Sequence, residues 1–196
     1  MEQVHVLADH GAWMLYLAGV AYRILPSVHW LLASQALALS CTALPIWWLA
    51  KQAGLGPRQC WLACGLWWLQ PVVFNAALFD FHPETWVMPA FALALWAERD
   101  GRPRLWFGLL LLMLGCRDGL VLITAGMAID LACRRRWRWS LTAGGISIGW
   151  LLMLSRWLYP LLRDGEGPKA AARMFSHLNG GPISVLSGLD WAGGAE

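Results

Sequence analysis

Long apolar stretches alternate with short polar ones along most of the chain. The clearest of them, 30–50 and 60–78, each supply about the twenty apolar residues that a helix needs to cross roughly 30 Å of hydrocarbon. Further apolar stretches run from about 83 to 96 and from 141 to 162. The pattern predicts an all-α protein, a polytopic transmembrane bundle of about five to seven apolar helices, some of them short or broken.

The apolar region 105–133 is interrupted by the sequence CRDG at 116–119. As a single helix this region would be about 43 Å long, which is too long for one crossing. Two arms of about fourteen residues fit better, and they leave Arg117 and Asp118 in a turn below the membrane surface. Charged turns at that depth are tolerated where they line a polar cavity, so we expect an outward-facing vestibule here.

We expect one membrane domain over the whole chain, 1–196. Near its beginning, a short apolar helix that ends before Pro26 is expected to lie at the membrane interface, because it is too short to cross comfortably. The end of the chain is polar and rich in glycine. The expected segments are an outer loop with the interfacial helix at 1–28, transmembrane helices at 29–162 and an outer polar tail at 163–196.

Composition strengthens the membrane interpretation. The chain is 58% hydrophobic and 14% charged, whereas soluble domains carry about 25% charged residues. The net charge of +3 is too small and too localised to indicate nucleic acid, so the lipid bilayer is the expected partner. The five cysteines lie in or beside apolar runs. Cys60 and Cys64 lack a second ligand pair, so we interpret the cysteines as packing residues and predict no metal site among them.

The basic residues concentrate in alternate short loops, next to tryptophans. By the positive-inside rule these loops face the cytoplasm, and the remaining loops face outward. Most of the tryptophans would then be interfacial anchors. The basic residues are Lys51, Arg58, Arg99, Arg102, Arg104, Arg134, Arg135, Arg136 and Arg138, and the flanking tryptophans are Trp47, Trp48, Trp61, Trp96, Trp106, Trp137 and Trp139.

The hexapeptide FDFHPE, residues 79–84, places three ionisable groups between apolar stretches on the outer side. In a functional interpretation, Asp80 and Glu84 supply a general base or metal ligands, and His82 contacts an anionic group. In a structural interpretation the same residues only begin a helix, because Pro83 suits the first helical position and Glu84 complements the helix dipole. Both interpretations stay open at this point.

The turn at Arg117 and Asp118 allows a similar pair of interpretations. Arg117 could grip a phosphate oxygen while Asp118 holds its guanidinium group, or the two could form an ion pair that only fixes a helix turn. His10, together with Asp9, is a weaker candidate for substrate binding. If the FDFHPE and CRDG loops build one vestibule, their nearest charged or polar atoms should lie within about 10 Å of each other.

These motifs resemble a family of bacterial polytopic membrane proteins described as a domain of unknown function. The resemblance covers about residues 9–186, and FDFHPE is its most specific part. That family is distantly similar to the lipid-sugar-dependent glycosyltransferases of the GT-C class, which have many membrane helices, an outward-facing active site and polyprenyl-phosphate-linked sugar donors. The sequences that carry the resemblance are FDFHPE, LPSVHWLLASQALALSCTALPIWWLAK and CRDGLVLITAGMAIDLACRRRWR.

The resemblance implies a partial GT-C-like core in the bacterial inner (plasma) membrane, with a polyprenyl-phosphate sugar as partner and no cofactor that the sequence names. The chain departs from the family in having Gly119 where a second acid is usual. It also lacks an initial helix of the family, so it looks like a fragment that is expected to be inactive alone. The expected site residues are Asp80, His82 and Glu84 for catalysis and Arg117, Asp118 and His10 for substrate binding.

Two other functions fit the same residues. One is a transporter or lipid-binding membrane protein, with a substrate site framed by the broken helices at 105–133. Inverted internal repeats would favour transport, and none is visible in the sequence. The other is a non-catalytic, truncated remnant of a longer protein.

Overall fold

The computed structural model describes residues 11–162, and within them it contains helices and turns but no strand. Contacts divide the chain into two units. The larger is Gly11–Leu151, and Leu152–Leu162 is the described part of the smaller. The all-α class predicted from the sequence is therefore confirmed for the described part of the chain.

The helices are short and follow one another closely. In chain order they are α2 (Met14–Ile24), α3 (Val28–Cys41), α4 (Ala43–Gln52), α5 (Pro57–Trp68), α6 (Pro71–Leu78), η1 (Pro83–Trp86), α7 (Val87–Arg99), α8 (Pro103–Cys116), η2 (Asp118–Leu120), α9 (Val121–Cys133), α10 (Trp137–Met153), the π-helical segment η3 (Leu154–Leu158) and α11 (Tyr159–Leu162).

Proline and glycine set many of the helix boundaries. Pro57, Pro71 and Pro103 each open a helix, where the missing N–H is not needed. The loops that precede two of these helices turn at Gly54 and Gly101, whose φ angles of 80° and 71° favour glycine. Several helix boundaries therefore follow from the positions of proline and glycine in the sequence.

The apolar stretch 60–78 is divided between two helices. It supplies enough apolar residues for one span, but α5 and α6 meet at a bend of 49°. The break lies at Gln70, directly before Pro71. Proline removes a backbone donor and disfavours helical geometry in the residue before it. The pair is thus a broken span or a re-entrant segment.

The described helices contain two that are long and apolar enough to cross a membrane, Val28–Gln52 and Trp137–Leu158, or three if the bent pair counts as one span. Met14–Ile24 and Pro103–Cys116 are apolar but shorter. Five to seven spans therefore remain a prediction. The two-arm prediction for 105–133 is confirmed, because α8 ends at Cys116 and α9 begins at Val121.

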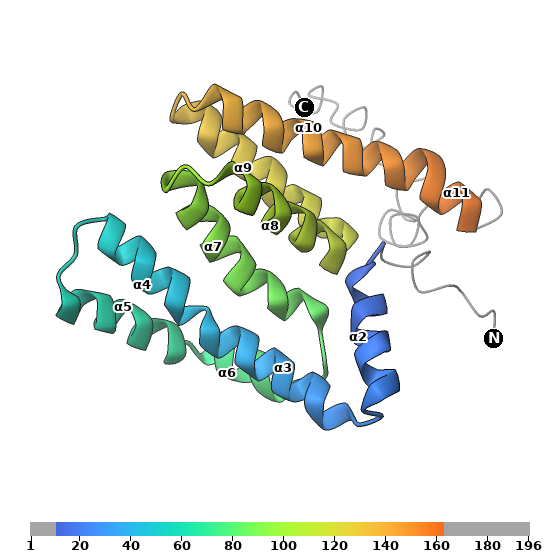
Figure 1. The fold of residues 1–196 in the computed structure, drawn as a ribbon, viewed down its shortest axis with the longest axis horizontal. Coiled ribbons are helices and arrows are strands. Elements are labelled where there is room, and N and C mark those ends of the chain that lie inside the picture. The colour runs from blue at the N-terminus through green and yellow to red at the C-terminus, as the bar shows by residue number, and fades with distance from the viewer. Residues whose placement is uncertain (1–10, 163–196) are drawn as a thin grey trace, which may run out of the picture. The chain divides into compact units, whose positions relative to one another are not determined.

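The chain of the larger unit reverses direction after α4, α6, α7, α8 and α9, so the loops at these points gather at two ends (Figure 1). The loops after α4, α7 and α9 lie toward the left of the view, whereas the α6–η1 loop and η2 lie away from them (Figure 1). Contacts agree with the picture: Gln52 Nε2 donates to the Trp96 carbonyl at 3.5 Å, and Arg134 forms an ion pair with Glu98. We call the first of these ends the basic end and the other the FDFHPE end.

Helix α7 packs against α8 in the centre of this unit. Its buried side contains Ala90, Ala94 and Ala97, spaced to lie on one helix face, and they share a hydrophobic cluster with Leu110 and Met113 of α8. Small residues on one helix let the next approach closely, which favours association of apolar helices in a membrane. The packed helices α7 and α8 connect the basic end with the FDFHPE end.

Candidate functional site

Gln35 organises the FDFHPE loop. Gln35 lies on α3, and it is 0% exposed. Its side chain forms hydrogen bonds with four backbone groups, one near the end of α6 and three in the hexapeptide. Nε2 donates to the carbonyls of Ala76, Phe79 and Asp80, at 2.7, 3.3 and 3.5 Å, and Oε1 accepts from the His82 amide at 2.8 Å. A buried backbone group without a partner is costly. One glutamine therefore replaces the hydrogen bonds that α6 loses where it ends.

The His82 ring has a defined tautomer in this loop. Its Nδ1 lies 2.6 Å from the Asp80 carbonyl oxygen. A carbonyl oxygen only accepts, so Nδ1 carries the hydrogen. In the neutral ring Nε2 is then an acceptor, and the ring itself is exposed and lies 5.4 Å from Phe79 between centroids. The loop thus presents an imidazole nitrogen that can accept a proton.

Glu84 and Arg117 join the FDFHPE and CRDG loops. Glu84 Oε1 lies 2.7 Å from Arg117 Nη1, and the side chains are 26% and 47% exposed. The expected proximity of the FDFHPE and CRDG loops is confirmed by this pair. Glu84 Oε2 is buried without a hydrogen-bond partner among the described residues. Arg117 has five N–H donors, so it can bind Glu84 and still donate to a ligand.

The other candidates take different positions. Pro83 opens the 3-10 turn η1, as the structural interpretation predicted, but the helix-start role does not account for the Glu84 contact with Arg117. Asp80 is exposed and contributes its carbonyl oxygen to Gln35 and His82. Asp118 Oδ1 accepts from the Gly119 amide at 2.8 Å. His10 and Asp9 lie outside the described residues.

Trp13 packs directly over the helix that carries Arg117. A Cβ atom added to Gly115 would overlap the Trp13 indole ring. Gly115 lies two positions before Arg117, at the end of α8. The close approach therefore ties the beginning of α2 to the turn at the site.

An apolar groove of about 380 Å³ lies among α2, the start of α3, η1 and α8. It shares the segment η1 with the ion pair, because Trp86 lines the groove and Glu84 stands two positions before it. The groove has space for a hydrocarbon chain. Its lining residues are Met14, Leu17, Ala18, Ala21, Trp30, Trp86 and Leu112.

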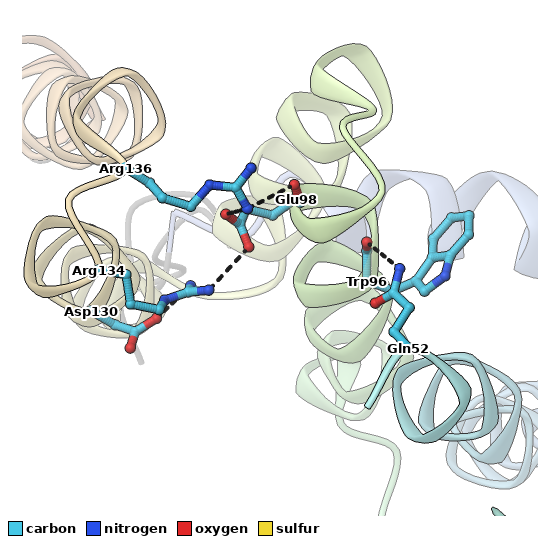
Figure 2. A network of polar contacts seen from close by, with 6 residues as sticks. All are labelled: Gln52, Trp96, Glu98, Asp130, Arg134 and Arg136. Carbon is cyan, nitrogen blue, oxygen red and sulfur yellow. Dashed lines mark hydrogen bonds and ion pairs between the residues drawn. The ribbon is translucent and has the colours of Figure 1, made fainter. Parts of the chain in front are cut away.

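A second glutamate–arginine cluster lies at the basic end (Figure 2). Glu98 is 1% exposed and forms ion pairs with Arg136 and, at 3.4 Å, with Arg134. Arg134 also pairs with Asp130 at 2.6 Å. This cluster links the end of α7 to the loop between α9 and α10 and brings together two of the loops that the positive-inside rule placed on one side.

Tryptophans gather at the same end in three pairs. The prediction that they anchor the protein at an interface is wrong for Trp106, which is 1% exposed and belongs to the core. Its flanking position next to a basic loop suggested an anchor, but the hydrophobic cluster that α8 shares with α7, together with the Trp139 ring, encloses the indole. The pairs are Trp47 with Trp61, Trp48 with Trp96 and Trp106 with Trp139, with ring centroids 5.0, 5.2 and 4.9 Å apart.

Gln35 and Glu98 are the two residues that sequence reasoning missed. A lone glutamine in an apolar helix was a signal for Gln35, because such a group needs partners when buried. An acid among arginines was the signal for Glu98. Within Gly11–Leu162, no group of three or more His, Cys, Asp or Glu side chains is arranged to hold a metal ion.

Comparison with protein families places the chain. The family model described as "Predicted membrane protein (DUF2079)" matches residues 1–190. The chain belongs to this family of membrane proteins. No curated protein and no solved structure matches the chain. Membership agrees with the exposed apolar side chains on the candidate spans, such as Leu37 and Leu44 on α3 and α4.

Proposed function

We propose that the protein is a membrane enzyme that transfers a sugar from a polyprenyl-phosphate carrier to an acceptor hydroxyl. One observation supports this most: the short segment η1 supplies both Glu84, which pairs with Arg117, and Trp86, which lines the apolar groove. A polyprenyl phosphate has the matching shape, a charged head on a long hydrocarbon chain. A soluble anion would use the arginine but not the groove.

In this proposal Arg117 binds the carrier phosphate. The guanidinium group donates to phosphate oxygens and stabilises the negative charge that grows on them as the sugar leaves. Glu84 positions the guanidinium through Nη1 and leaves its other donors for the phosphate. The isoprenoid chain lies in the groove between α2 and α8, against Trp30 and Trp86.

His82 accepts the proton in the same proposal. The acceptor oxygen attacks the anomeric carbon of the sugar, the bond from that carbon to the phosphate oxygen breaks, and polyprenyl phosphate leaves. The acceptor's hydroxyl proton passes to Nε2, which is the free acceptor nitrogen of the neutral ring. The bond from Nδ1 to the Asp80 carbonyl orients the ring for this step.

We place this site at the outer face of the bacterial inner membrane. The three basic loops gather at the opposite end of the larger unit, and basic loops favour the cytoplasmic side. Single-cysteine labelling at position 55, in a background without the native cysteines, should therefore require a membrane-permeant reagent. Labelling of position 55 from outside would reverse the assignment.

Binding tests the first half of the proposal. Purified full-length protein is titrated with polyprenyl phosphate, and the quenching of tryptophan fluorescence is followed, because Trp30 and Trp86 line the groove. We expect Arg117→Gln to weaken binding about 10- to 100-fold, the cost of a charged hydrogen bond. Arg58→Gln, which removes an exposed arginine outside the site, is the matched control.

The head group and the chain are separated by two further probes. Uncharged polyprenyl alcohol should bind weakly to the parent protein and equally weakly to Arg117→Gln. Inorganic phosphate alone should bind weakly to both. Equal affinity of the parent protein for polyprenyl alcohol and polyprenyl phosphate, or no effect of Arg117→Gln on polyprenyl phosphate binding, would contradict the proposal.

A lipid-binding or transport function would use the same groove and the same arginine. Transfer of labelled sugar from the polyprenyl-phosphate donor to an acceptor separates the two functions. His82→Asn should keep donor binding and lose transfer. If the parent protein binds the donor but transfers nothing, a lipid-binding role is the better description.

A further inference from the structure

A second groove lies at the basic end, away from the site described above. Its volume is about 590 Å³, and it runs between the beginning of α8 and the beginning of α10. Both helices start directly after a basic loop. The lining residues are Pro103, Arg104, Trp106, Phe107, Arg138, Trp139 and Thr142.

The charge of this groove is positive. Arg104 and Arg138 belong to its lining, which contains no acidic residue. The nearby acids are bound to other arginines: Glu98 pairs with Arg134 and Arg136, and Asp100 pairs with Arg102 at 2.5 Å. Neither acid is therefore needed to neutralise Arg104 or Arg138, and the groove suits an anion.

The walls of the groove are aromatic. Trp106 and Trp139 meet edge to face with centroids 4.9 Å apart, and Arg136 lies over the Trp139 ring at 5.7 Å. Phe107 is 44% exposed, so one side of the groove offers an open apolar surface. A ligand that combines a negative group with hydrocarbon fits both features.

We propose that this groove binds an anionic phospholipid of the membrane. The lipid phosphate lies between Arg104 and Arg138, and an acyl chain lies along Phe107 and Trp139. Basic grooves between membrane helices, on the side rich in arginine, are suited to anionic lipid head groups. A free sugar phosphate would leave the aromatic wall exposed. The inference does not depend on the proposed transferase activity, because the residues of the two sites are different.

The test compares two lipids on the purified full-length protein. Delipidated protein is mixed with phosphatidylglycerol or with phosphatidylcholine, and the bound lipid is counted by native mass spectrometry. We expect phosphatidylglycerol to be retained preferentially. Arg104→Gln and Arg138→Gln should each weaken its binding about 5-fold, and together about 30-fold, which corresponds to about 1 kcal/mol for each basic residue.

Two matched variants decide whether the groove itself is the site. Arg58→Gln with Arg99→Gln removes the same charge from the basic loops outside the groove, and it should leave binding within about 2-fold of the parent if binding is local. Thr142→Trp fills the groove without changing its charge, and it should also weaken phosphatidylglycerol binding.

Three results would overturn the inference. They are equal retention of the two lipids by the parent protein, equal loss of binding in the groove pair and the control pair, and unchanged binding in Thr142→Trp. The second result would show that the basic end attracts anionic lipid only through its overall charge. Melting temperatures of all variants, measured without lipid, separate loss of binding from loss of folding.

Discussion

The two ends of the larger unit contain the same chemical pair in different surroundings. At the basic end, Glu98 is 1% exposed and contacts two arginines. At the FDFHPE end, Glu84 is 26% exposed and contacts Arg117, which is 47% exposed. The first glutamate joins helices that are far apart in the sequence, and the second joins two loops.

The difference in burial indicates different roles. A carboxylate removed from water needs its partners, so the Glu98 cluster stabilises the packing of α7 with the α9–α10 loop. A pair that is open to solvent contributes little to stability. The Glu84–Arg117 pair can therefore exchange partners with a ligand at low cost, as the proposed phosphate site requires.

The largest expected effect is at Glu98. Glu98→Gln removes the shared partner of Arg134 and Arg136 and should lower the free energy of unfolding by about 3 kcal/mol. We choose the lower end of the range for a broken buried pair because both arginines are about one-third exposed and can turn to water. Reversible unfolding of the purified protein in mixed micelles measures the change.

The control for this variant is Asp130→Asn. Asp130 is 58% exposed and pairs with Arg134 one helical turn away, so its loss should cost about 0.5 kcal/mol or less. Equal effects of the two variants would show that burial does not distinguish them, and the comparison between the ends would lose its basis.

The second expected effect compares two glutamines on the long apolar helix Val28–Gln52. Gln35→Leu removes the bonds that hold the hexapeptide loop and should lower the free energy of unfolding by about 2 kcal/mol, because buried backbone groups lose their partners. It should also speed amide exchange in the segment 79–85. Gln52→Leu removes an exposed bond of 3.5 Å at the basic end and should change neither. Slow exchange in the Gln35 variant would show that other contacts hold the loop.

The smallest expected effect on stability is at Glu84. Glu84→Gln and Arg117→Gln should each change the free energy of unfolding by less than about 1 kcal/mol. The coupling energy from a double-mutant cycle should be about 0.5 kcal/mol. A coupling as large as that between Glu98 and Arg136, measured in the same way, would make this pair a structural element and remove the main support for a ligand site.

The parts of the fold that sequence predicted depend on strong local signals. Arg117 interrupts an apolar region, and an arginine between apolar helices calls for a carboxylate partner, so both the break after α8 and its approach to the FDFHPE loop could be expected. Pro26 ended the first helix as predicted. Pro71 is a signal of the same kind, and it bends the apolar stretch 60–78 although the two helices together are apolar enough for one span.

The parts that sequence did not predict depend on contacts between distant segments. Gln35 forms hydrogen bonds with backbone groups more than forty positions away. Every residue has such backbone groups, so the sequence does not indicate which of them Gln35 will meet. Glu98 stood in the sequence ERDGRPR, where Arg99, Arg102 and Arg104 were nearer partners along the chain. In the structure, Glu98 instead pairs with Arg134 and Arg136. Predicting that these residues lie in a basic loop does not show which acid they will contact.

The contact between Trp13 and Gly115 has a consequence for evolution. The indole ring occupies the space that a side chain at position 115 would need, so a residue larger than glycine there forces the Trp13 ring to move. Among descendants of this sequence, we expect a larger residue at 115 to occur mostly together with a smaller residue at 13. Correlated substitutions at positions 13 and 115 would thus indicate that the beginning of α2 keeps its place next to the turn at Arg117.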